Sequence, residues 1–546
     1  MNPDWTKGTR FNPFPNMFFW GWLFILGLTH HRKWWHSLTK PLRIYPFSMN
    51  HIAVKNNERL SLTSIPRSDY ERFLEHNTAL LDDSANHCVT YFGVPEDGKI
   101  KLICGIANDN EHNIYLSCAE INRTEILPSF SKHHLAFQVF ERELHENFGI
   151  NFSDHPWLKP VRFAFDRADK DSCIEYYPFY QSDSVELHEV GVGPIHAGII
   201  EPGHFRFICN GEQILHLEIQ LGFQHRGIER LFLEKKTLLQ RTTLAESIAG
   251  DTVAGHTTAF VNLWEALCGF QADDELRFTR TLALELERIA VHTGDLSAIC
   301  TDIGYQLGNA VFGRLRTPII NFFQQWCGNR LAKGLIRAGN NHFPFDKELG
   351  IALKNMLDQY KPDFNEICQK TFRQPSVLSR LEKTGVVSWE QAGSIGAVGM
   401  AARASGSERD IRKTHPHDKY INLGHQPVIK HHGDVYSRVQ VRKAEIIQSI
   451  GYIRDLLMHL PAESREKKEL GSPAANSIVI SLTEGWRGEI CHCAITDQQG
   501  ALRHYKIKDP SIHNWVALAL AVRNNEISDF PVCNKSFNLS YSGHDL

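Results

Sequence analysis

Histidine and cysteine are the residue types whose chemistry this chain offers most visibly, with 29 histidines and twelve cysteines among 546 residues. Neither type shows zinc-site spacing, and there is no Cys-x-x-Cys pair. Cys491 and Cys493 are two residues apart in an expected strand, so both thiols should face one side, as packing residues do. Without a dense, even cysteine framework, the sequence favours a reducing compartment.

Two histidines beside proline and glycine, His196 and His204, are the first candidates for proton chemistry. They lie in the segment Gly193-Pro-Ile-His-Ala-Gly-Ile-Ile-Glu-Pro-Gly-His-Phe-Arg206. An imidazole titrates near neutral pH and delivers a proton well when a carboxylate orients it. The alternative is that both side chains only form hydrogen bonds to the turns beside them, and the sequence leaves both interpretations open.

The segment Gln224-His-Arg-Gly-Ile-Glu229 is a second candidate. His225 and Glu229 are four residues apart, which on a helix places them on one face. Glu229 would then be a carboxylate of a proton pathway or simply a helical partner of His225. The glycine-rich segment 393–399 lacks the Gly-x-Gly-x-x-Gly spacing of a phosphate loop, so we expect close packing there.

Two kinds of structure must position these residues. Strands are predicted at 101–107, 113–118, 204–209 and 214–221. Helices are predicted at 131–148, ending at Gly149, and at 231–268, 275–300 and 433–457. We therefore expect an α+β protein, with a small N-terminal α/β domain (49–180) and a larger, mainly helical domain (186–546) that starts with a small β-sheet.

The net charge and the N-terminal segment limit the kinds of partner that the chain can have. With 59 basic and 62 acidic residues the formal charge is −3, which argues against nucleic acid as a partner. Residues 1–48 contain the 12-residue apolar run Met17–Leu28, which is shorter than the roughly 20 residues that span a bilayer. This leader is either an interfacial anchor or an extension upstream of a true start at Met49.

Ordered motifs along the chain carry a family resemblance. They are the segment from Gly193 to Arg206, Gln224–Glu229, Glu285–His292, Asp302–Gly304, Ala402–Gly406, Gly433–Arg438, Arg487–Glu489 and Tyr505–Pro510. Together they resemble the large subunit of group 4 membrane-bound nickel–iron hydrogenases and the D component of NADH:quinone oxidoreductase, while 141–158 resembles the C component of that enzyme. The resemblance covers about residues 50–546 and implies a fused C–D protein, as in formate hydrogenlyase-type large subunits.

The resemblance also places the nickel–iron ligands, which this chain lacks. The family's first cysteine pair corresponds to Ala249 and Thr252, and its second pair to Ser540 and Gly543. Thiolates hold both metals in that family, so a nickel–iron centre is not expected here. Asp251, His256 and His544 are the remaining candidate ligands near these positions, and we expect no metal on them either.

In the D component, the emptied metal cavity and its surroundings form the quinone headgroup site, so the resemblance implies quinone as a substrate. It implies catalytic roles for His196, His204 and Asp302. The implied acceptor-binding residues are Gly250, Asp251, Thr252, His256, His225, Arg226 and Glu229. One departure is that Gly250 stands where the D component has a tyrosine that donates to the quinone, whereas Thr252 keeps a small hydroxyl.

The implied setting is a peripheral subunit on the cytoplasmic face of the inner membrane, in a complex that couples electron transfer to ion translocation. Expected partners are a small iron–sulfur subunit, which carries the clusters, and antiporter-like and quinone-module membrane subunits. We expect no cofactor bound by this chain itself. The alternative is a catalytically silent scaffold subunit, and hydrogenase activity ranks third.

Overall fold

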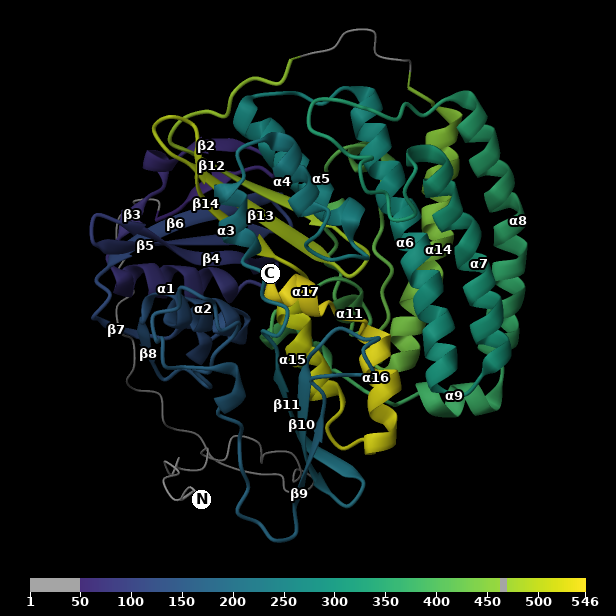
Figure 1. Cartoon of the computed structure of the whole chain (residues 1–546), viewed down its shortest axis with the longest axis horizontal. Coiled ribbons are helices and arrows are strands. Elements are labelled where there is room, and N and C mark those ends of the chain that lie inside the picture. The colour runs from purple at the N-terminus through teal and green to yellow at the C-terminus, as the bar shows by residue number, and fades with distance from the viewer. Residues whose placement is uncertain (1–49, 462–468) are drawn as a thin grey trace, which may run out of the picture. The chain divides into compact units, whose positions relative to one another are not determined.

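The computed structural model describes residues 50–461 and 469–546 (Figure 1). Residues 49–546 form one compact unit. The expected anchor at Met17–Leu28 and the expected start at Met49 lie outside the described residues. None of the described helices combines the length and the apolar character needed to cross a bilayer.

The N-terminal part is built on one sheet in the order β1-β6-β5-β4, and β3 joins β6 in parallel. Its strands are β1 (Ile52–Val54), β3 (Arg67–Ser68), β4 (Asn86–Glu96), β5 (Lys99–Asn108) and β6 (Asn113–Ile121). Helix α1 (Tyr70–Leu81) packs on β4, β5 and β6, and α2 (Gln138–Phe148) packs on β4. The predicted strands at 101–107 and 113–118 are confirmed as parts of β5 and β6.

The helix predicted over 131–148 is wrong at its start. Short 3-10 turns occupy 130–132 and 135–137, and α2 begins only at Gln138. The backbone N–H and hydroxyl groups of Ser131 are used to bind the buried carboxylate of Glu141, which competes with continuing the helix. The predicted end at Gly149 is confirmed, with a left-handed φ of 75°.

A second sheet connects the two ends of the chain. Its order is β14-β13-β12-β2, with strands β2 (Arg59–Ser61), β12 (Ser477–Glu484), β13 (Glu489–Thr496) and β14 (Leu502–Lys508). Its apolar residues share one buried cluster with those of the N-terminal sheet, and Cys491 and Cys493 both lie in that cluster as expected. The expected domain boundary between residues 180 and 186 stays a prediction about which two proteins were fused. It does not separate two hydrophobic cores, because both parts contribute residues to this cluster.

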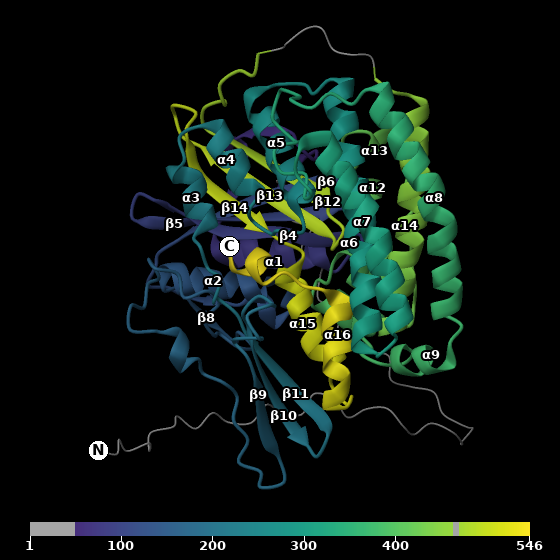
Figure 2. The ribbon, with the colours of Figure 1, turned by 45° about the vertical axis from the view of Figure 1, so that its right-hand side comes forward.

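The small sheet expected at the start of the larger part is present in the order β11-β10-β9. Its strands are β9 (His188–Val192), β10 (His204–Asn210) and β11 (Gln213–Gln220), which confirms the predictions at 204–209 and 214–221. Figure 2 shows this sheet next to α15 (Ser511–Ala521) and α16 (Phe530–Phe537). The remaining two-stranded parallel pair is β7 (Ile126–Pro128) with β8 (Asn151–Ser153).

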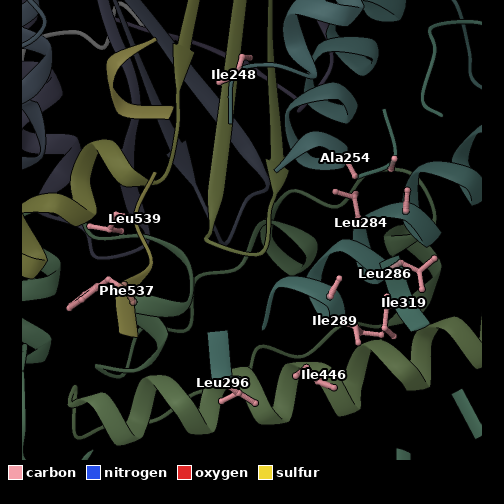
Figure 3. Packing of buried hydrophobic residues seen from close by; sticks show 14 of the residues in the cluster. Ile248, Ala254, Leu284, Leu286, Ile289, Leu296, Ile319, Ile446, Phe537 and Leu539 are labelled. Atoms are coloured by element: carbon pink, nitrogen blue, oxygen red, sulfur yellow. The ribbon is translucent and has the colours of Figure 1, made fainter. Parts of the chain in front are cut away.

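The helical part packs long helices against one another (Figure 1). They are α6 (Asp274–Asp302), α7 (Gln306–Cys327), α8 (Lys347–Thr371) and α14 (Val435–Met458), and α6 and α14 confirm the predictions at 275–300 and 433–457. The shorter helices that follow are α9 (Pro375–Leu381), α10 (Trp389–Ser394), α11 (Gly399–Arg403), α12 (Ile411–Thr414), α13 (Tyr420–Leu423) and α17 (Tyr541–Asp545). Residues from α5 (Val253–Cys268), α6, α7, α14 and the segment around Leu539 belong to one buried apolar cluster, part of which Figure 3 shows.

The single helix predicted over 231–268 is wrong. The chain forms α3 (Ile228–Glu234), α4 (Leu238–Ala245) and α5 (Val253–Cys268) instead. Thr237 starts α4 with a capping box to Gln240. Between α4 and α5 lies a turn around Gly250 and Asp251, which positions several of the predicted site residues.

Candidate functional site

The two segments that the resemblance matches to the family's cysteine pairs meet in this structure through Arg487. Its Nη1 and Nη2 atoms donate to the Asp251 carboxylate at 2.7 and 2.6 Å, and Nη1 also donates to Thr252 Oγ1 at 2.9 Å. From the same side chain, Nε donates to the carbonyl of Asn538 at 2.5 Å. We call the residues Gly250–His256, Arg487 and Asn538–Asp545 the junction.

Arg226 connects the same two segments from another side. Its guanidinium donates to the carbonyls of Ser247 at 2.6 Å and Ile248 at 2.8 Å, just before the Gly250 turn. It also donates to the carbonyl of Ser542 at 3.2 Å. The predicted binding residues Asp251, Thr252 and Arg226 therefore do belong to one contiguous region.

The junction does not offer a nickel–iron ligand set. Thr252 provides a hydroxyl that already accepts a hydrogen bond from Arg487, and Ala249 and Gly543 provide no ligand atom. A Cβ at Gly543 would lie 2.7 Å from the carboxyl carbon of Asp509, so that carboxylate stands close to the position of a family cysteine. A guanidinium cation also sits between the two segments, which opposes binding of a metal cation. The residues present do not fit this centre.

Glu287 of α6 is a buried carboxyl group that contacts the junction. It accepts hydrogen bonds from the backbone N–H of Ala254 at 2.7 Å and of Gly255 at 3.2 Å, in the first turn of α5. Burial raises the pKa of Glu287 to about 8 despite these hydrogen bonds, and the charge of Asp251 adds to the rise. This carboxyl group can therefore hold a proton near neutral pH.

The two candidate histidines occupy the β9–β10 loop (Gly193–Gly203) and its end. His196 Nε2 donates to the carbonyl of Gly203 at 2.8 Å, and His204 Nδ1 donates to the carbonyl of Gly193 at 3.0 Å. A carbonyl only accepts, so these nitrogens carry the hydrogens. Both histidines thus form hydrogen bonds to the neighbouring turns, as the alternative interpretation requires, and among the described residues His204 Nε2 has no hydrogen-bond partner.

The base of the β9–β10 loop contacts the junction through Tyr541. A Cβ on Gly203 would lie 2.6 Å from the Tyr541 ring, so the backbone approaches the ring closely. Glu201 accepts a hydrogen bond from the backbone N–H of Tyr541 at 3.3 Å, and the ring of Phe205 lies edge-on to Tyr541. The histidine loop is thus held against one of the two segments of the junction.

Asp302 lies at the last residue of α6 and is exposed. No hydrogen bond or ion pair joins it to His196 or His204 in the part of the chain that the structure describes. Besides Glu287, the α6 carboxylate of Asp295 contacts the junction: it accepts from Asn538 Nδ2 at 2.8 Å and pairs with Arg442 Nε at 3.0 Å.

The helical pairing of His225 with Glu229 is wrong. Because α3 begins only at Ile228, His225 lies in the preceding turn, where its Nδ1 contacts the carbonyl of Asp545 at 2.7 Å. Glu229 accepts from the backbone N–H of Ile507 at 2.9 Å and pairs with Lys506 at 3.1 Å. Glu229 therefore faces β14, whereas His225 faces the junction.

Sequence reasoning missed the roles of Arg487, Asp509 and Glu287. All three lie in motifs that carried the resemblance, so their positions were visible but their contacts were not. The close packing expected at 393–399 is confirmed at Gly399, where a Cβ would lie 2.0 Å from the carbonyl oxygen of Arg487, but not at Gly393, where a Cβ would meet no atom within 4 Å.

A cavity of about 370 Å³ lies away from all of the predicted site residues. Charged and amide side chains dominate its lining, which consists of Leu62, Thr63, Glu96, Lys101, Asn476, Asp497, Gln498, Gln499 and Arg503. None of the contacts that build the junction involves these residues, so this cavity is not the candidate site.

A large cluster of buried charges lies between α6, α14 and the end of β12. Its members are the carboxylates Glu285, Asp410, Glu445 and Glu484, the guanidiniums Arg288, Arg403 and Arg412, and the imidazoles His292 and His425. Glu445 accepts from Arg403 at 2.8 Å and from His292 at 2.9 Å, and its side chain is 0% exposed. We call these residues the Glu445 cluster.

Comparison with known proteins supports the division into two family parts. The model described as "Respiratory-chain NADH dehydrogenase, 30 Kd subunit" matches residues 65–182, and "Respiratory-chain NADH dehydrogenase, 49 Kd subunit" matches residues 302–476. The chain is 30% identical over 344 residues to the D component of the NADH-quinone oxidoreductase of Dehalococcoides mccartyi, covering 62% of this chain and 93% of that protein.

Two further similarities extend this comparison. Hydrogenase-4 component G of Escherichia coli is 26% identical over 391 residues, which cover 72% of this chain and 67% of that protein. A chain of the archaeal membrane-bound sulfane sulfur reductase has the same fold, with a TM-score of 0.62 at 20% identity, covering 67% of this chain and all of that one. The chain therefore belongs to the family of the NADH-quinone oxidoreductase D component, here fused to the 30-kDa subunit, with membrane-bound hydrogenase large subunits among its relatives.

Proposed function

We propose that this chain forms the acceptor site in the peripheral arm of a membrane-bound complex and there passes electrons to a quinone or a similar acceptor, coupled to ion translocation. One observation carries the proposal. The β9–β10 loop, the Gly250 turn and segment 538–545, which the resemblance assigns to the acceptor site, come together through Tyr541, Arg226 and Arg487.

In this proposal His204 supplies a proton to the reduced acceptor. Its Nδ1–H is held by the Gly193 carbonyl, which leaves Nε2 as the nitrogen that takes up and releases a proton. His196 is fixed in the same way through Nε2 and offers Nδ1. Asp302 would orient His204 once acceptor is bound. Gly250, Asp251, Thr252, His256, His225, Arg226 and Glu229 would shape the surrounding site.

The test is a single turnover of the intact complex, reduced with dithionite and mixed with decylubiquinone. His204→Ala and Asp302→Asn should each slow acceptor reduction by roughly 10²-fold, the lower end of what a positioned proton donor contributes. His216→Ala, on the neighbouring strand β11, is the matched control and should leave the rate unchanged. Wild-type rates in both site variants, with normal assembly, would remove the proton-donor roles from this proposal.

The alternative is a catalytically silent scaffold subunit. The observation that favours it is that both histidines already bind carbonyls of their own turn. In that case, the reduced wild-type complex would not reduce decylubiquinone, while ferricyanide, which takes electrons without protons, would still oxidise its clusters.

We also propose that the chain has no nickel–iron centre and that its electrons come from clusters in a small iron–sulfur partner. The partners would include antiporter-like and quinone-module membrane subunits, with this chain on the cytoplasmic face of the membrane. Elemental analysis of the purified chain should find neither nickel nor iron in stoichiometric amount. About one nickel per chain would contradict the correspondence of Ala249, Thr252, Ser540 and Gly543 with the family cysteines.

A further inference from the structure

Four buried side chains form a continuous hydrogen-bonded line beside the junction. Asp509 Oδ2 lies 3.0 Å from His256 Nε2, His256 Nδ1 lies 3.0 Å from His492 Nε2, and His492 Nδ1 lies 2.8 Å from the hydroxyl of Tyr505. Asp509, His256 and His492 are 0% exposed and Tyr505 is 1% exposed. Burying four polar side chains is costly unless each is satisfied, and here each satisfies the next.

The fold places this line between α5 and the second sheet. On β13, Cys491 and Cys493 point into the apolar cluster shared with the N-terminal sheet, so His492 between them points the other way, toward α5. Tyr505 lies on β14, where Ala494 is its direct partner, and thus faces the same side as His492. Two adjacent strands and one helix hold the four groups in order.

The hydrogens along the line have only two consistent orders. Burial alone would raise the pKa of Asp509, but the hydrogen bond from His256 and the charge of Arg487 hold it below its usual value, so Asp509 accepts. If His256 is neutral, its Nδ1 must accept from His492 Nε2–H, and His492 Nδ1 must accept from the Tyr505 hydroxyl. If His256 carries a second proton, two hydrogen bonds reverse: His256 Nδ1 then donates to His492 Nε2, and His492 Nδ1 donates to the Tyr505 oxygen.

These two orders differ by one proton, and the change from one to the other needs no movement of a side chain. The Tyr505 proton passes to His492 Nδ1 while the His492 Nε2 proton passes to His256 Nδ1, and a hydronium ion that arrives from the side of α3 returns one proton to the Tyr505 oxygen and leaves as water. Each of the two transfers along the line breaks one O–H or N–H bond and forms one N–H bond. The result is one proton taken up at Tyr505 and one additional proton on His256, beside the Asp509 carboxylate.

We propose that Asp509, His256, His492 and Tyr505 form a proton relay that supplies the junction from the side of α3. At the junction end, Asp509 stands against Gly543 and is influenced by Arg487. At the outer end, the Tyr505 ring stacks on Phe232 of α3, with centroids 4.1 Å apart. The charged groups acting on Tyr505 there are Arg241 and the half-buried Glu229.

The relay rests on the proposed function, because reduction of a quinone consumes protons at the junction. Neither Tyr505 nor His492 needs to touch the acceptor, so these two are positioning residues for protons rather than catalytic residues. The relay also gives Glu229 a role different from a helical pair with His225, as a carboxylate whose charge acts on Tyr505 at the outer end.

The experiment uses the intact complex in the same dithionite single turnover. Tyr505→Phe keeps the ring and its stacking but removes the hydroxyl, and His492→Gln keeps hydrogen bonding but cannot exchange protons between two nitrogens. Each should slow decylubiquinone reduction by roughly 10²-fold, raise the solvent deuterium isotope effect, and leave ferricyanide reduction unchanged. Tyr360→Phe, whose hydroxyl contacts Thr293 at 2.6 Å in the helical part, is the control for losing a buried phenol hydroxyl.

Wild-type decylubiquinone rates and isotope effects in both variants would overturn the relay while leaving the proposed function intact. Equal slowing with both acceptors would also overturn it, because electron transfer would then be at fault.

If the wild-type complex does not reduce decylubiquinone, the relay can still be tested by a measurement that does not depend on catalytic turnover. In ¹⁵N-histidine NMR of the full chain, assigned with His492→Gln, both imidazoles should carry their hydrogen on Nε2 at high pH. On acidification His256 should gain its second proton as the His492 hydrogen moves to Nδ1, with one shared midpoint. Independent midpoints, or a His492 hydrogen on Nδ1 at high pH, would reject the relay.

Discussion

The Glu445 cluster and the β9–β10 loop use polar and apolar residues in opposite ways. In the cluster, carboxylates and guanidiniums are fully buried and pair with one another. In the loop, Ile195 and Ile199 are 81% and 86% exposed, although the adjacent histidines are held by their own turn. The cluster has its partners within the chain, whereas an exposed apolar loop is suited to contact another subunit. Substitutions should therefore affect folding in the first region and assembly in the second.

The largest effect is expected from Glu445→Ala. This change leaves the guanidinium of Arg403 and the imidazole of His292 without their buried carboxylate, and breaking a buried pair from one side costs about 3–5 kcal/mol. Urea unfolding of the full chain measures the loss. Lys354→Ala is the control, because the Lys354–Asp358 pair is exposed and screened by solvent and should contribute little to stability. Similar losses in both variants would contradict the contrast between buried and exposed charge.

An effect that depends on pH, and that reaches a comparable size only at its upper limit, is expected at Glu287. Its pKa is about 8 in the folded chain against an ordinary value of 4.5, so the folded state binds the additional proton between these values. The stabilisation from this proton is present below the unfolded pKa and is lost as pH rises toward 8, at up to about 1.4 kcal/mol per pH unit. Glu287→Gln should flatten this decline in urea unfolding between pH 5 and about pH 8. An unchanged slope would mean that Glu287 is ionised in the folded protein.

The smallest effect on stability is expected in the β9–β10 loop. Ile199→Ser should change the free energy of unfolding by no more than about 0.5 kcal/mol, because the side chain is exposed. The same change should reduce recovery of membrane subunits in purification of the complex. The contrast with the cluster would fail if Ile199→Ser unfolded the chain or if assembly were unaffected.

Long periodic elements were predictable from sequence because their signals are local. The helix expected at 275–300 appears as α6, starting after Asp273, whose side chain caps it. The strand alternation around Cys491 and Cys493 gave the correct buried face. The start of the helix predicted at 131–148 was wrong because Ser131 forms hydrogen bonds to Glu141. A tertiary contact of that kind leaves no periodic pattern in the sequence.

The sequence allowed us to predict which segments form the candidate site, but not which side chains contact one another within it. The resemblance indicated that the Gly250 turn and segment 538–545 belong together, and Arg226 and Arg487 do join them. It did not indicate that His492 faces His256, which is 236 residues away in sequence. The orienting role expected of Asp302 stays a prediction, because acceptor binding is needed to test it.

The pairing of β2 with β12 constrains the order in which this fused chain is completed during synthesis. Leu60 pairs with Ile478, so the ribosome makes about 420 residues between the two partners. At roughly 5–20 residues per second, β2 waits on the order of 20–80 s for its neighbour. During that interval the backbone N–H and C=O groups of β2 that later pair with β12 have no partner strand, and they can pair with the edge strand of another sheet. The fusion therefore ties the first strands of the chain to its last ones, and the nascent N-terminal part depends on shielding until translation is nearly finished.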